Sequence, residues 1–419
     1  MRVMFVAPFP PPYGGVASFI VSMINGLPKF GLNDITVVSF GDISLIETFN
    51  EATVYRIKLS SKHNLLKLLY VSNWVTIMKS IWVLKSGKLG FYGLIKEVLK
   101  TIILNEIAEK HNSNIISFNQ SNLSICLISC RKLWKQKRGI ALTVYGEVYD
   151  TSVFIKKRIN FMKKVINIPD IVMASSNHCA MSYKTIGVKR DISVNYVGVN
   201  IDRMSDDESK RLKYREELGI DETTQLVVFV GRFNPEMGLD ILIEIIPIIL
   251  SEFKKAKFLL VGASGELTLS AEKLKDDFKD QVFIFNDVSF DLLPFIYAAS
   301  DIVLAPSRDQ HACMGVSIKE AMAASRPVIG SSSGGIPEAI VNNETGLIVN
   351  LDEKGNIDKK QFVKAILSLL NNKERASEMG DRGRVRVIEL FSEEASVKRI
   401  IKYFKVVQEK FQNNILNSF

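Results

Sequence analysis

Short apolar segments alternate with helical patterns along most of the chain, and this alternation is the feature that most constrains the fold. Seven expected strands come first, at residues 3–7, 35–40, 54–59, 114–118, 140–145, 170–174 and 192–197. Six more follow at residues 226–230, 258–261, 282–285, 302–305, 328–330 and 346–349. Strands separated by helices are typical of a parallel sheet covered by helices. We therefore expect an α/β fold with two Rossmann-like, doubly wound domains.

The boundary between the two series is expected near residue 203. Residues 204–217 are dense in Asp, Glu, Lys and Arg and show no buried strand pattern. We predict a first domain over residues 1–203, a second over 204–395 and a C-terminal helix over 396–419. Two such domains would face each other across a cleft, where ligands of doubly wound folds bind. The C-terminal helix carries an apolar stripe at helical spacing, so we expect it to cross back to the first domain for a partner surface.

The composition is that of a folded protein. Of 419 residues, 47% are hydrophobic and 24% are charged, which excludes disordered, collagen-like and low-complexity architectures. Four cysteines are too few for a disulfide scaffold. Cys126 and Cys130 lie in an apolar run without a nearby His, so we expect residues on a helix face and no metal site.

No membrane span or secretory signal is expected. Residues 2–6 already form a strand pattern, without the charged and long apolar regions of a signal. The longest uncharged apolar stretch, residues 68–78, is closed by Lys67 and Lys79 and is too short to span a membrane. The default expectation is a cytoplasmic enzyme or binding protein.

The net charge of +9 is concentrated in one segment. Residues 58–100 contain eight lysines and a single acid, Glu97, interleaved with Leu, Ile, Trp and Tyr. Basic groups mixed with aromatic anchors are typical of a surface that rests on anionic lipid, which favours a peripheral protein of the membrane. The alternative is a set of core helices whose lysines face water. Nucleic acid is not expected as a partner, because Arg is scarce here and no recognition motif accompanies the lysines.

Four loops at the ends of expected strands have the residues of an anion site. The loop after the first strand ends in Gly14-Gly15, and glycines there let the backbone approach a phosphate. Arg232 follows the first strand of the second series, where a guanidinium suits a pyrophosphate, unless it pairs with a structural acid.

The other two loops follow later strands of the second series. Met314 and Gly315 are expected at a helix N-terminus, with Glu320 further along the same helix, where a carboxylate can accept hydrogen bonds from a sugar diol. Gly334 and Gly335 lie between the strand at 328–330 and a helix that starts with Pro. Taken together, the four loops at the ends of expected strands indicate one phosphate-bearing ligand.

At these residues the chain resembles the large family 4 of retaining glycosyltransferases, whose architecture of two Rossmann-like domains is called GT-B. The matching segments are Gly14-Gly15 and residues 195–202, 230–232, 320–323, 327–329, 334–338 and 345–349. The resemblance implies transfer of a sugar from a nucleoside-diphosphate sugar with retained configuration, without a metal or other cofactor. The implied acceptor is a saccharide or lipid-linked molecule of surface polysaccharide or lipopolysaccharide synthesis.

The resemblance also implies the roles of individual residues. Arg232 and Glu320 would be catalytic. Residues that would bind the donor are Gly14, Gly15, Met237, Met314, Gly315, Gly334 and Gly335. Glu320 is expected to contact the ribose or sugar of the donor, so replacing it with Ala should abolish transfer and leave thermal stability nearly unchanged.

Three positions depart from the family pattern. Met237 stands where the family usually has a Lys that pairs with Arg232 on the pyrophosphate, and Met cannot donate a hydrogen bond to phosphate. Ala312 stands where a Glu is usual, and Tyr145 lies where a His is common. Either the site is rebuilt, with Asp309, His311, Lys319 and Tyr145 as candidates for compensation, or the chain is a binding or partner subunit with impaired catalysis. A nucleotide-sugar epimerase of the same architecture is a third, less supported alternative.

Overall fold

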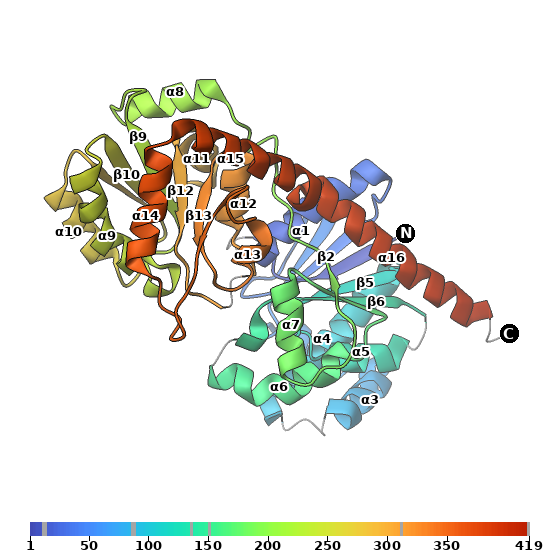
Figure 1. Ribbon diagram of the computed structural model, residues 1–419. Coiled ribbons are helices and arrows are strands. Elements are labelled where there is room, and N and C mark those ends of the chain that lie inside the picture. The colour runs from blue at the N-terminus through green and yellow to red at the C-terminus, as the bar shows by residue number, and fades with distance from the viewer. Residues whose placement is uncertain (11–14, 85–88, 135–136, 150–151, 311–312, 417–419) are drawn as a thin grey trace. The chain divides into compact units, whose positions relative to one another are not determined.

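The computed structural model describes residues 1–10, 15–84, 89–134, 137–149, 152–310 and 313–416. The chain forms two compact units (Figure 1). The first contains residues 1–198 and 396–419, and the second contains residues 199–395. Each unit has one twisted sheet covered by helices, which confirms the predicted α/β class with two parallel-sheet units.

The division of the chain falls at Gly198, a few residues before the boundary predicted at 203. Backbone hydrogen bonds explain the difference. The amide of Val199 donates to the carbonyl of Phe391 (2.8 Å), and the amide of Glu393 donates to the carbonyl of Val199 (3.0 Å). The Arg203 side chain also stacks on Phe290, with its guanidinium carbon 3.7 Å from the ring centroid. Residues 199–203 therefore belong to the second unit, although the change in composition begins only after them.

The first sheet has the strand order β3-β4-β2-β1-β5-β6-β7-β8. All neighbouring strands are parallel except β3, which is antiparallel to β4. The strands are β1 (Val3–Val6), β2 (Ile35–Phe40), β3 (Leu45–Phe49), β4 (Ala52–Ile57), β5 (Ile115–Asn119), β6 (Gly139–Val144), β7 (Ile171–Ala174) and β8 (Ser193–Val194). Every strand expected in this unit is present, although the last is only two residues long.

Strand β3 was not predicted from the sequence. It lies at the edge of the sheet, and its side chains Leu45 and Ile46 are exposed, so it lacks the buried pattern of the other strands. Asn50 and Glu51, both with positive φ, form the tight turn that pairs β3 with β4. Positive φ at both central positions is typical of the turn that joins two antiparallel strands.

The helices of the first unit pack on both faces of its sheet. They are α1 (Gly15–Gly26), α2 (Lys62–Leu66), α3 (Trp74–Leu84), α4 (Phe91–Lys110), α5 (Leu127–Trp134), α6 (Val153–Ile166) and α7 (Asn177–Thr185). The long last helix, α16 (Glu393–Leu416), joins this unit from residue 396 onward. None of the helices among the described residues is long and apolar enough to cross a membrane.

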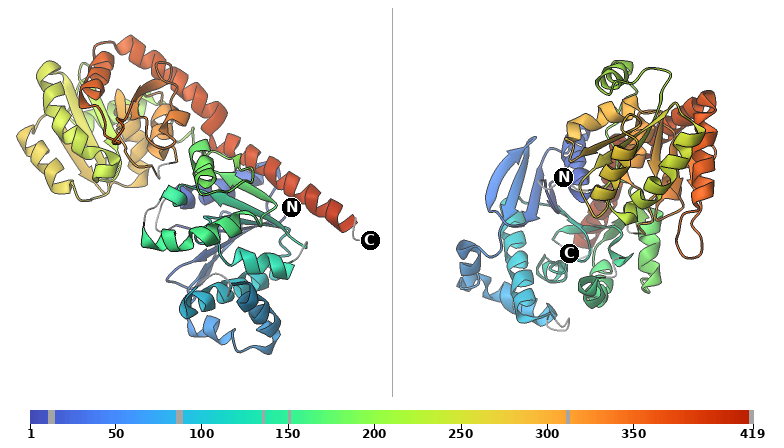
Figure 2. Two further views of the ribbon diagram at one scale, coloured as in Figure 1. Left: turned by 60° about the horizontal axis from the view of Figure 1, so that its bottom comes forward. Right: turned by 90° about the vertical axis from the view of Figure 1, so that its left-hand side faces the viewer.

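Helix α16 packs on the core of the first unit, as the apolar stripe predicts. Its side chains Val397, Ile400, Phe404 and Val407 are buried in the same cluster as strand β1, and Figure 2 shows the helix in red alongside that unit. Two glycines permit this close approach. A Cβ atom at Gly26 would lie 2.5 Å from Val397, and one at Gly139 would lie 2.3 Å from Val407.

The second sheet is wholly parallel, with the strand order β11-β10-β9-β12-β13-β14. Its strands are β9 (Gln225–Val230), β10 (Ala256–Gly262), β11 (Val282–Asn286), β12 (Ile302–Ala305), β13 (Val328–Ser331) and β14 (Gly346–Val349). Its helices are α8 (Glu208–Glu217), α9 (Leu239–Glu252), α10 (Thr268–Asp277), α11 (Leu293–Ala299), α12 (Val316–Ala323), α13 (Ile336–Ala339), α14 (Lys359–Leu370) and α15 (Lys373–Arg386). All six strands lie where the sequence predicts them.

Both sheets have a position where the strand order reverses. Strand β1 lies between β2 and β5, and strand β9 lies between β10 and β12. The connections on the two sides of such a strand leave in opposite directions, which opens a crevice at the carboxyl ends of the strands. These two positions are the places in the fold where a ligand site is expected.

Candidate functional site

Arg232 lies in the turn at the carboxyl end of β9, and the next residue, Phe233, fixes the position of this turn. Phe233 is fully buried, and its amide donates to the carbonyl of Ala263 (3.0 Å). The Arg232 side chain is exposed, and within the described part of the chain it forms no ion pair or hydrogen bond. Its guanidinium is therefore available to an anion, and the alternative of pairing with a structural acid is not realised among these residues.

The cation that does pair with an acid in this region is Arg308, which follows β12. Its Nη2 atom lies 2.8 Å from both carboxylate oxygens of Asp240 and donates to the carbonyl of Pro235 (2.6 Å). Its amide donates to the carbonyl of Glu236 (2.7 Å). Arg308 thus joins the loop after β9 to the loop after β12. Sequence reasoning missed this residue, because nothing local to it identifies Asp240 as its partner.

Met237 ends a short 3-10 turn, Pro235–Met237, in the loop after β9. The side chain is partly buried and packs against the core of the second unit. A Cβ atom at Gly231 would lie 3.1 Å from the Met237 terminal methyl, so this side chain lies over the backbone next to Arg232. An apolar group therefore occupies the position where the resemblance implies a second cation.

Helix α12 begins beside the loop after β12. Gly315 precedes it with φ 71°, a left-handed conformation that favours glycine, and Met314 is buried. The first amide groups of the helix lack partners within the helix and give its N-terminus a partial positive charge. Lys319 lies on the same helix and is buried. Gly14 and His311, as well as Ala312, lie outside the described residues.

Glu320 is buried on helix α12, with 5% of its surface exposed. Its Oε2 atom accepts a hydrogen bond from the hydroxyl of Tyr297 (3.0 Å), a fully buried residue of helix α11. Burial raises the pKa of Glu320, while the Tyr297 hydrogen bond and the charges of Arg203 and Lys319 oppose this change. Sequence reasoning identified Glu320 and missed Tyr297, which lies 23 positions earlier.

The loop after β13 packs against the start of α12. Gly334 has φ 54°. A Cβ atom at Gly335 would lie only 1.4 Å from the carbonyl oxygen of Cys313, so only glycine fits there. The Ser331 hydroxyl donates to the carbonyl of Ser307 in the loop after β12. The loops after β9, β12 and β13 therefore converge, and they bring an exposed guanidinium, a helix N-terminus and glycine-rich backbone to one edge of the sheet.

Asp309 lies within these loops, and its amide donates to the Ser307 hydroxyl (3.1 Å). Tyr145, a further candidate for compensation, belongs to the first unit. It is buried after strand β6, and its hydroxyl donates to Oδ1 of Asn119 (3.2 Å). Gly15 is exposed at the first position of helix α1.

Glu147 lies beside Tyr145 and accepts three hydrogen bonds. The donors are the amides of Tyr145 (2.6 Å) and Ser121 (2.9 Å) and the hydroxyl of Tyr183 (3.2 Å). Burial raises the pKa of Glu147, and these hydrogen bonds oppose the change. This network orders the loops after β5 and β6, and sequence reasoning missed it.

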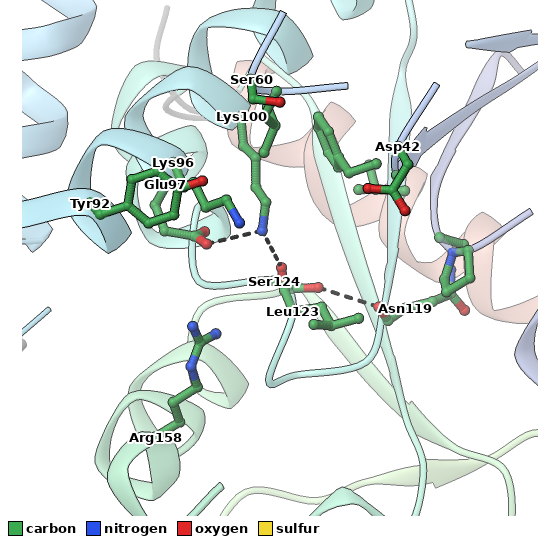
Figure 3. Close-up of a pocket in the computed structure, with 16 residues that line it drawn as sticks. Asp42, Ser60, Tyr92, Lys96, Glu97, Lys100, Asn119, Leu123, Ser124 and Arg158 are labelled. Carbon is green, nitrogen blue, oxygen red and sulfur yellow. Dashed lines mark hydrogen bonds and ion pairs between the residues drawn. The ribbon is translucent and has the colours of Figure 1, made fainter. Parts of the chain in front are cut away.

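A pocket of about 440 Å³ lies at the carboxyl ends of β1, β2 and β5 in the first unit (Figure 3). Residues of helices α4 and α6 complete it, and all of its lining residues belong to the first unit. The lining residues with charged or polar side chains are Asp42, Ser60, Tyr92, Lys96, Glu97, Lys100, Asn119, Ser124 and Arg158. Among the described residues, no group of three or more His, Cys, Asp or Glu could hold a metal ion.

Comparison with known proteins identifies the second unit most directly. Residues 210–386 match the family model of the glycosyl transferases group 1. Over 194 residues the chain is 33% identical to a GDP-mannose-dependent alpha-(1-6)-phosphatidylinositol monomannoside mannosyltransferase of Mycobacterium tuberculosis, covering 45% of this chain and 49% of that protein. Over 297 residues it is 25% identical to the N-acetyl-alpha-D-glucosaminyl L-malate synthase of Bacillus anthracis, covering 70% and 75%.

Solved structures resemble nearly the whole chain. Sucrose-phosphate synthase from Thermosynechococcus elongatus has a TM-score of 0.72 at 18% identity, covering 98% of this chain and 100% of that one. Anabaena HepE in complex with UDP has a TM-score of 0.72 at 16% identity, covering 97% and 100%. The chain matches about half the length of the mannosyltransferase relative. These matches show that residues 210–386 resemble the group 1 glycosyltransferases and that the two units have the folds of the GT-B class.

Proposed function

We propose that the chain is a glycosyltransferase that transfers a sugar from a nucleoside-diphosphate sugar, bound by the second unit, to an acceptor bound by the first. The observation that carries this proposal is the convergence of three loops around the exposed Arg232 guanidinium. A guanidinium, a helix N-terminus and glycine-rich backbone are suited to a pyrophosphate. The UDP in the complex with HepE, a protein of the same fold, supports this assignment.

The proposed chemistry is electrostatic. When the bond between the sugar and the nucleoside diphosphate breaks, negative charge develops on the leaving phosphate. Arg232 and the N-terminus of α12 would stabilise that charge, which lowers the barrier. We propose that the anomeric configuration is retained and that no metal is needed, because the resemblance to family 4 implies both.

The role of Glu320 follows from its burial. The Glu320 carboxyl group is buried, and its Oε2 atom accepts the hydrogen bond from Tyr297, while its other oxygen has no hydrogen-bond donor among the described residues. We propose that this oxygen accepts a hydrogen bond from a hydroxyl of the donor. The pair of Tyr297 and Glu320 then acts as one unit, in which the tyrosine fixes the direction of the carboxyl group.

One experiment tests the proposed function against its rival. The rival is a binding or partner subunit with impaired catalysis, and the apolar contacts of Met237 next to Arg232 are the observation that favours it. Full-length protein would be titrated calorimetrically with UDP, GDP, ADP, CDP and dTDP, and hydrolysis of the matching sugar nucleotides would then be followed. Binding of one nucleotide that is lost in Arg232→Gln, together with slow hydrolysis of its sugar derivative, supports a transferase. Binding without hydrolysis, or no binding of any nucleotide, contradicts the transferase and supports the rival.

We further propose that the first unit rests on an anionic membrane surface. The outer face of helix α3 carries Trp74, Met78 and Trp82, all exposed, and Trp82 has 71% of its surface accessible. The alternative is a set of core helices whose lysines face water, and such a helix would present charged side chains on its outer face. An exposed apolar stripe flanked by lysines suits the boundary between lipid headgroups and acyl chains. Two of the eight lysines, Lys85 and Lys88, lie outside the described residues.

A charge reversal tests the membrane proposal. Lys62→Glu with Lys79→Glu changes two exposed lysines of this surface. Lys254→Glu with Lys255→Glu makes the same change of net charge at exposed positions of the second unit. Surface attraction amounts to about 1 kcal/mol per basic residue near an anionic leaflet, so the first pair should reduce binding to phosphatidylglycerol vesicles by at least about tenfold. Equal loss in both pairs would show that the first unit has no specific membrane surface.

A further inference from the structure

The pocket of the first unit has a floor of buried polar side chains. Lys100 comes from α4, Asn119 ends β5, and Ser124 lies in the loop that follows β5. Asn119 and Ser124 are each 2% exposed, and 13% of the Lys100 side chain is exposed. Figure 3 shows the three residues following one another along the pocket. Because a buried polar group needs hydrogen-bond partners, the bonds that these groups can still form indicate what the pocket binds.

The cations of this floor interact with a buried carboxylate. Lys100 donates to Glu97 (2.9 Å) and to the carbonyl of Leu123 (3.3 Å). Arg158 donates to the carbonyl of Asn122 (2.8 Å). Burial lowers the pKa of Arg158, and the charge of Glu97 opposes this change. An ammonium group has three N–H donors, so among the described residues Lys100 has one left for a ligand. The floor thus offers an N–H donor, and the positive charge behind it is compensated by Glu97.

The two other groups of the floor are oriented by hydrogen bonds within the protein. The Oδ1 atom of Asn119 accepts from the Tyr145 hydroxyl (3.2 Å), and its Nδ2 atom donates to the carbonyl of Ser117 (3.4 Å). The Ser124 hydroxyl donates to the carbonyl of Gln120 (2.6 Å). Within the described chain, one N–H of Asn119 and the acceptor side of the Ser124 oxygen remain for a ligand. Together with the ammonium group, the floor therefore presents two donors and one acceptor.

The rim of the pocket carries one charge of each sign and an aromatic ring. Asp42 and Lys96 are both exposed, and neither forms an ion pair with another described residue. The Lys96 ammonium lies 5.0 Å from the centre of the Tyr92 ring, which is 65% exposed. Because the two charges of the rim balance, they do not favour an anion over an uncharged ligand. An exposed aromatic ring beside polar groups suits a ligand with an apolar face and a polar edge.

We propose that this pocket binds an uncharged saccharide through adjacent hydroxyl groups, and that this saccharide is the acceptor. A sugar hydroxyl both donates and accepts, so two neighbouring hydroxyls can accept from Lys100 and Asn119 while one of them donates to Ser124. The Asp42 carboxylate can accept from a further hydroxyl, and the Tyr92 ring can cover the apolar face of the sugar. The assignment as acceptor rests on the proposed transferase function, whereas the binding of the saccharide does not.

The transfer step needs no group beyond the donor and this acceptor. A hydroxyl oxygen of the bound saccharide forms a bond to the anomeric carbon of the donor sugar. The bond between that carbon and the diphosphate oxygen breaks, and its electron pair leaves with the nucleoside diphosphate. The proton of the attacking hydroxyl passes to the leaving phosphate.

Soluble probes test this proposal on the full-length protein. The uncharged probes are the methyl glycosides of glucose, galactose, mannose and N-acetylglucosamine, and the anionic probes are glycerol 1-phosphate and glucose 6-phosphate. Titrations followed by saturation-transfer NMR should show binding of at least one glycoside, and neither phosphate should bind more tightly than that glycoside. Absence of binding by all four glycosides would overturn the proposal. A phosphate that binds at least tenfold more tightly than every glycoside would overturn the assignment of an uncharged ligand.

Variants at exposed positions locate the binding. Tyr92→Ala and Asp42→Asn should each weaken binding of the glycoside about threefold or more, since each removes one contact. The matched controls are Phe91→Ala, an exposed aromatic residue beside Tyr92, and Asp34→Asn, an exposed acid of the same unit. Neither control residue lines the pocket. Unchanged binding in both pocket variants, or equal weakening by the controls, would refute the site.

The failure of this proposal can be told apart from failure of the proposed function. Nucleotide binding should be unchanged in both pocket variants, since their residues lie in the first unit. Nucleotide binding with hydrolysis, but without binding of any glycoside, refutes the pocket assignment and leaves the transferase function in place. Glycoside binding without binding of any nucleoside diphosphate leaves the saccharide site in place and refutes the transferase function, and with it the assignment of the saccharide as acceptor.

Discussion

Replacing Glu320 with Ala should destabilise the protein, although the sequence predicts nearly unchanged stability. The structure shows the reason. The Tyr297 hydroxyl donates to the Glu320 carboxyl group (3.0 Å), and Tyr297 is fully buried. Without its acceptor, this hydroxyl is left unpaired away from water, which costs about 1–3 kcal/mol. For a domain of about 200 residues, 2 kcal/mol lowers the melting temperature by about 4–8 °C.

The contribution of Glu320 to the stability of the protein should also depend on pH, and the direction follows from its pKa. Burial raises the pKa of Glu320 above its ordinary value of 4.5, so the folded protein binds the proton more tightly than the unfolded chain does. The stability that this proton contributes is fully present below pH 4.5 and is lost as the pH rises through the folded-state pKa. Glu320→Gln, which cannot ionise, should therefore gain stability relative to the wild type as the pH rises above 4.5.

Thermal melting of the full-length chain at several pH values measures both effects. Tyr297→Phe removes the hydroxyl and its need for a partner, so the double variant Glu320→Ala with Tyr297→Phe should be less destabilised than the sum of the two single variants. Additive single effects, or an alanine variant that melts with the wild type, would refute the role of this hydrogen bond. A glutamine variant whose relative stability falls as the pH rises would refute the direction of the pKa change.

Two further predictions concern the loops of the second unit. Met237→Lys should tighten nucleoside-diphosphate binding by about tenfold, since it adds a cation beside Arg232 at the proposed pyrophosphate site; unchanged or weaker affinity in calorimetric titration would mean that another cation has replaced it. Gly335→Ala should destabilise the protein by about 3 kcal/mol or more, because its Cβ would lie 1.4 Å from the Cys313 carbonyl oxygen. The control is Gly41→Ala, which has no neighbour within 4 Å, and equal melting temperatures for the two variants would contradict the packing argument.

Much of the fold follows from local patterns. A buried parallel strand is a short apolar run, and such runs predict the positions of β9 to β14 and of every first-unit strand except β3. Loops at the carboxyl ends of these strands can then be located, and with them Arg232, Gly315 and Gly335. The edge strand β3 escapes this reasoning, because an exposed strand has no buried pattern to reveal it.

Contacts between side chains that lie far apart in the sequence are determined only by the tertiary structure. The apolar periods of strands and helices are local properties, so the sequence determines which segments form these elements and which loops follow them. It does not determine which side chains meet once the sheets are assembled. Arg308 contacts Asp240, Tyr297 contacts Glu320, and Lys96 shares a pocket with Arg158 only because the assembled sheets bring distant helices and loops together. The packing of these elements also determines which side chains are buried. It buries Glu320, which raises the pKa of that carboxyl group, and it leaves the Arg232 side chain exposed to solvent.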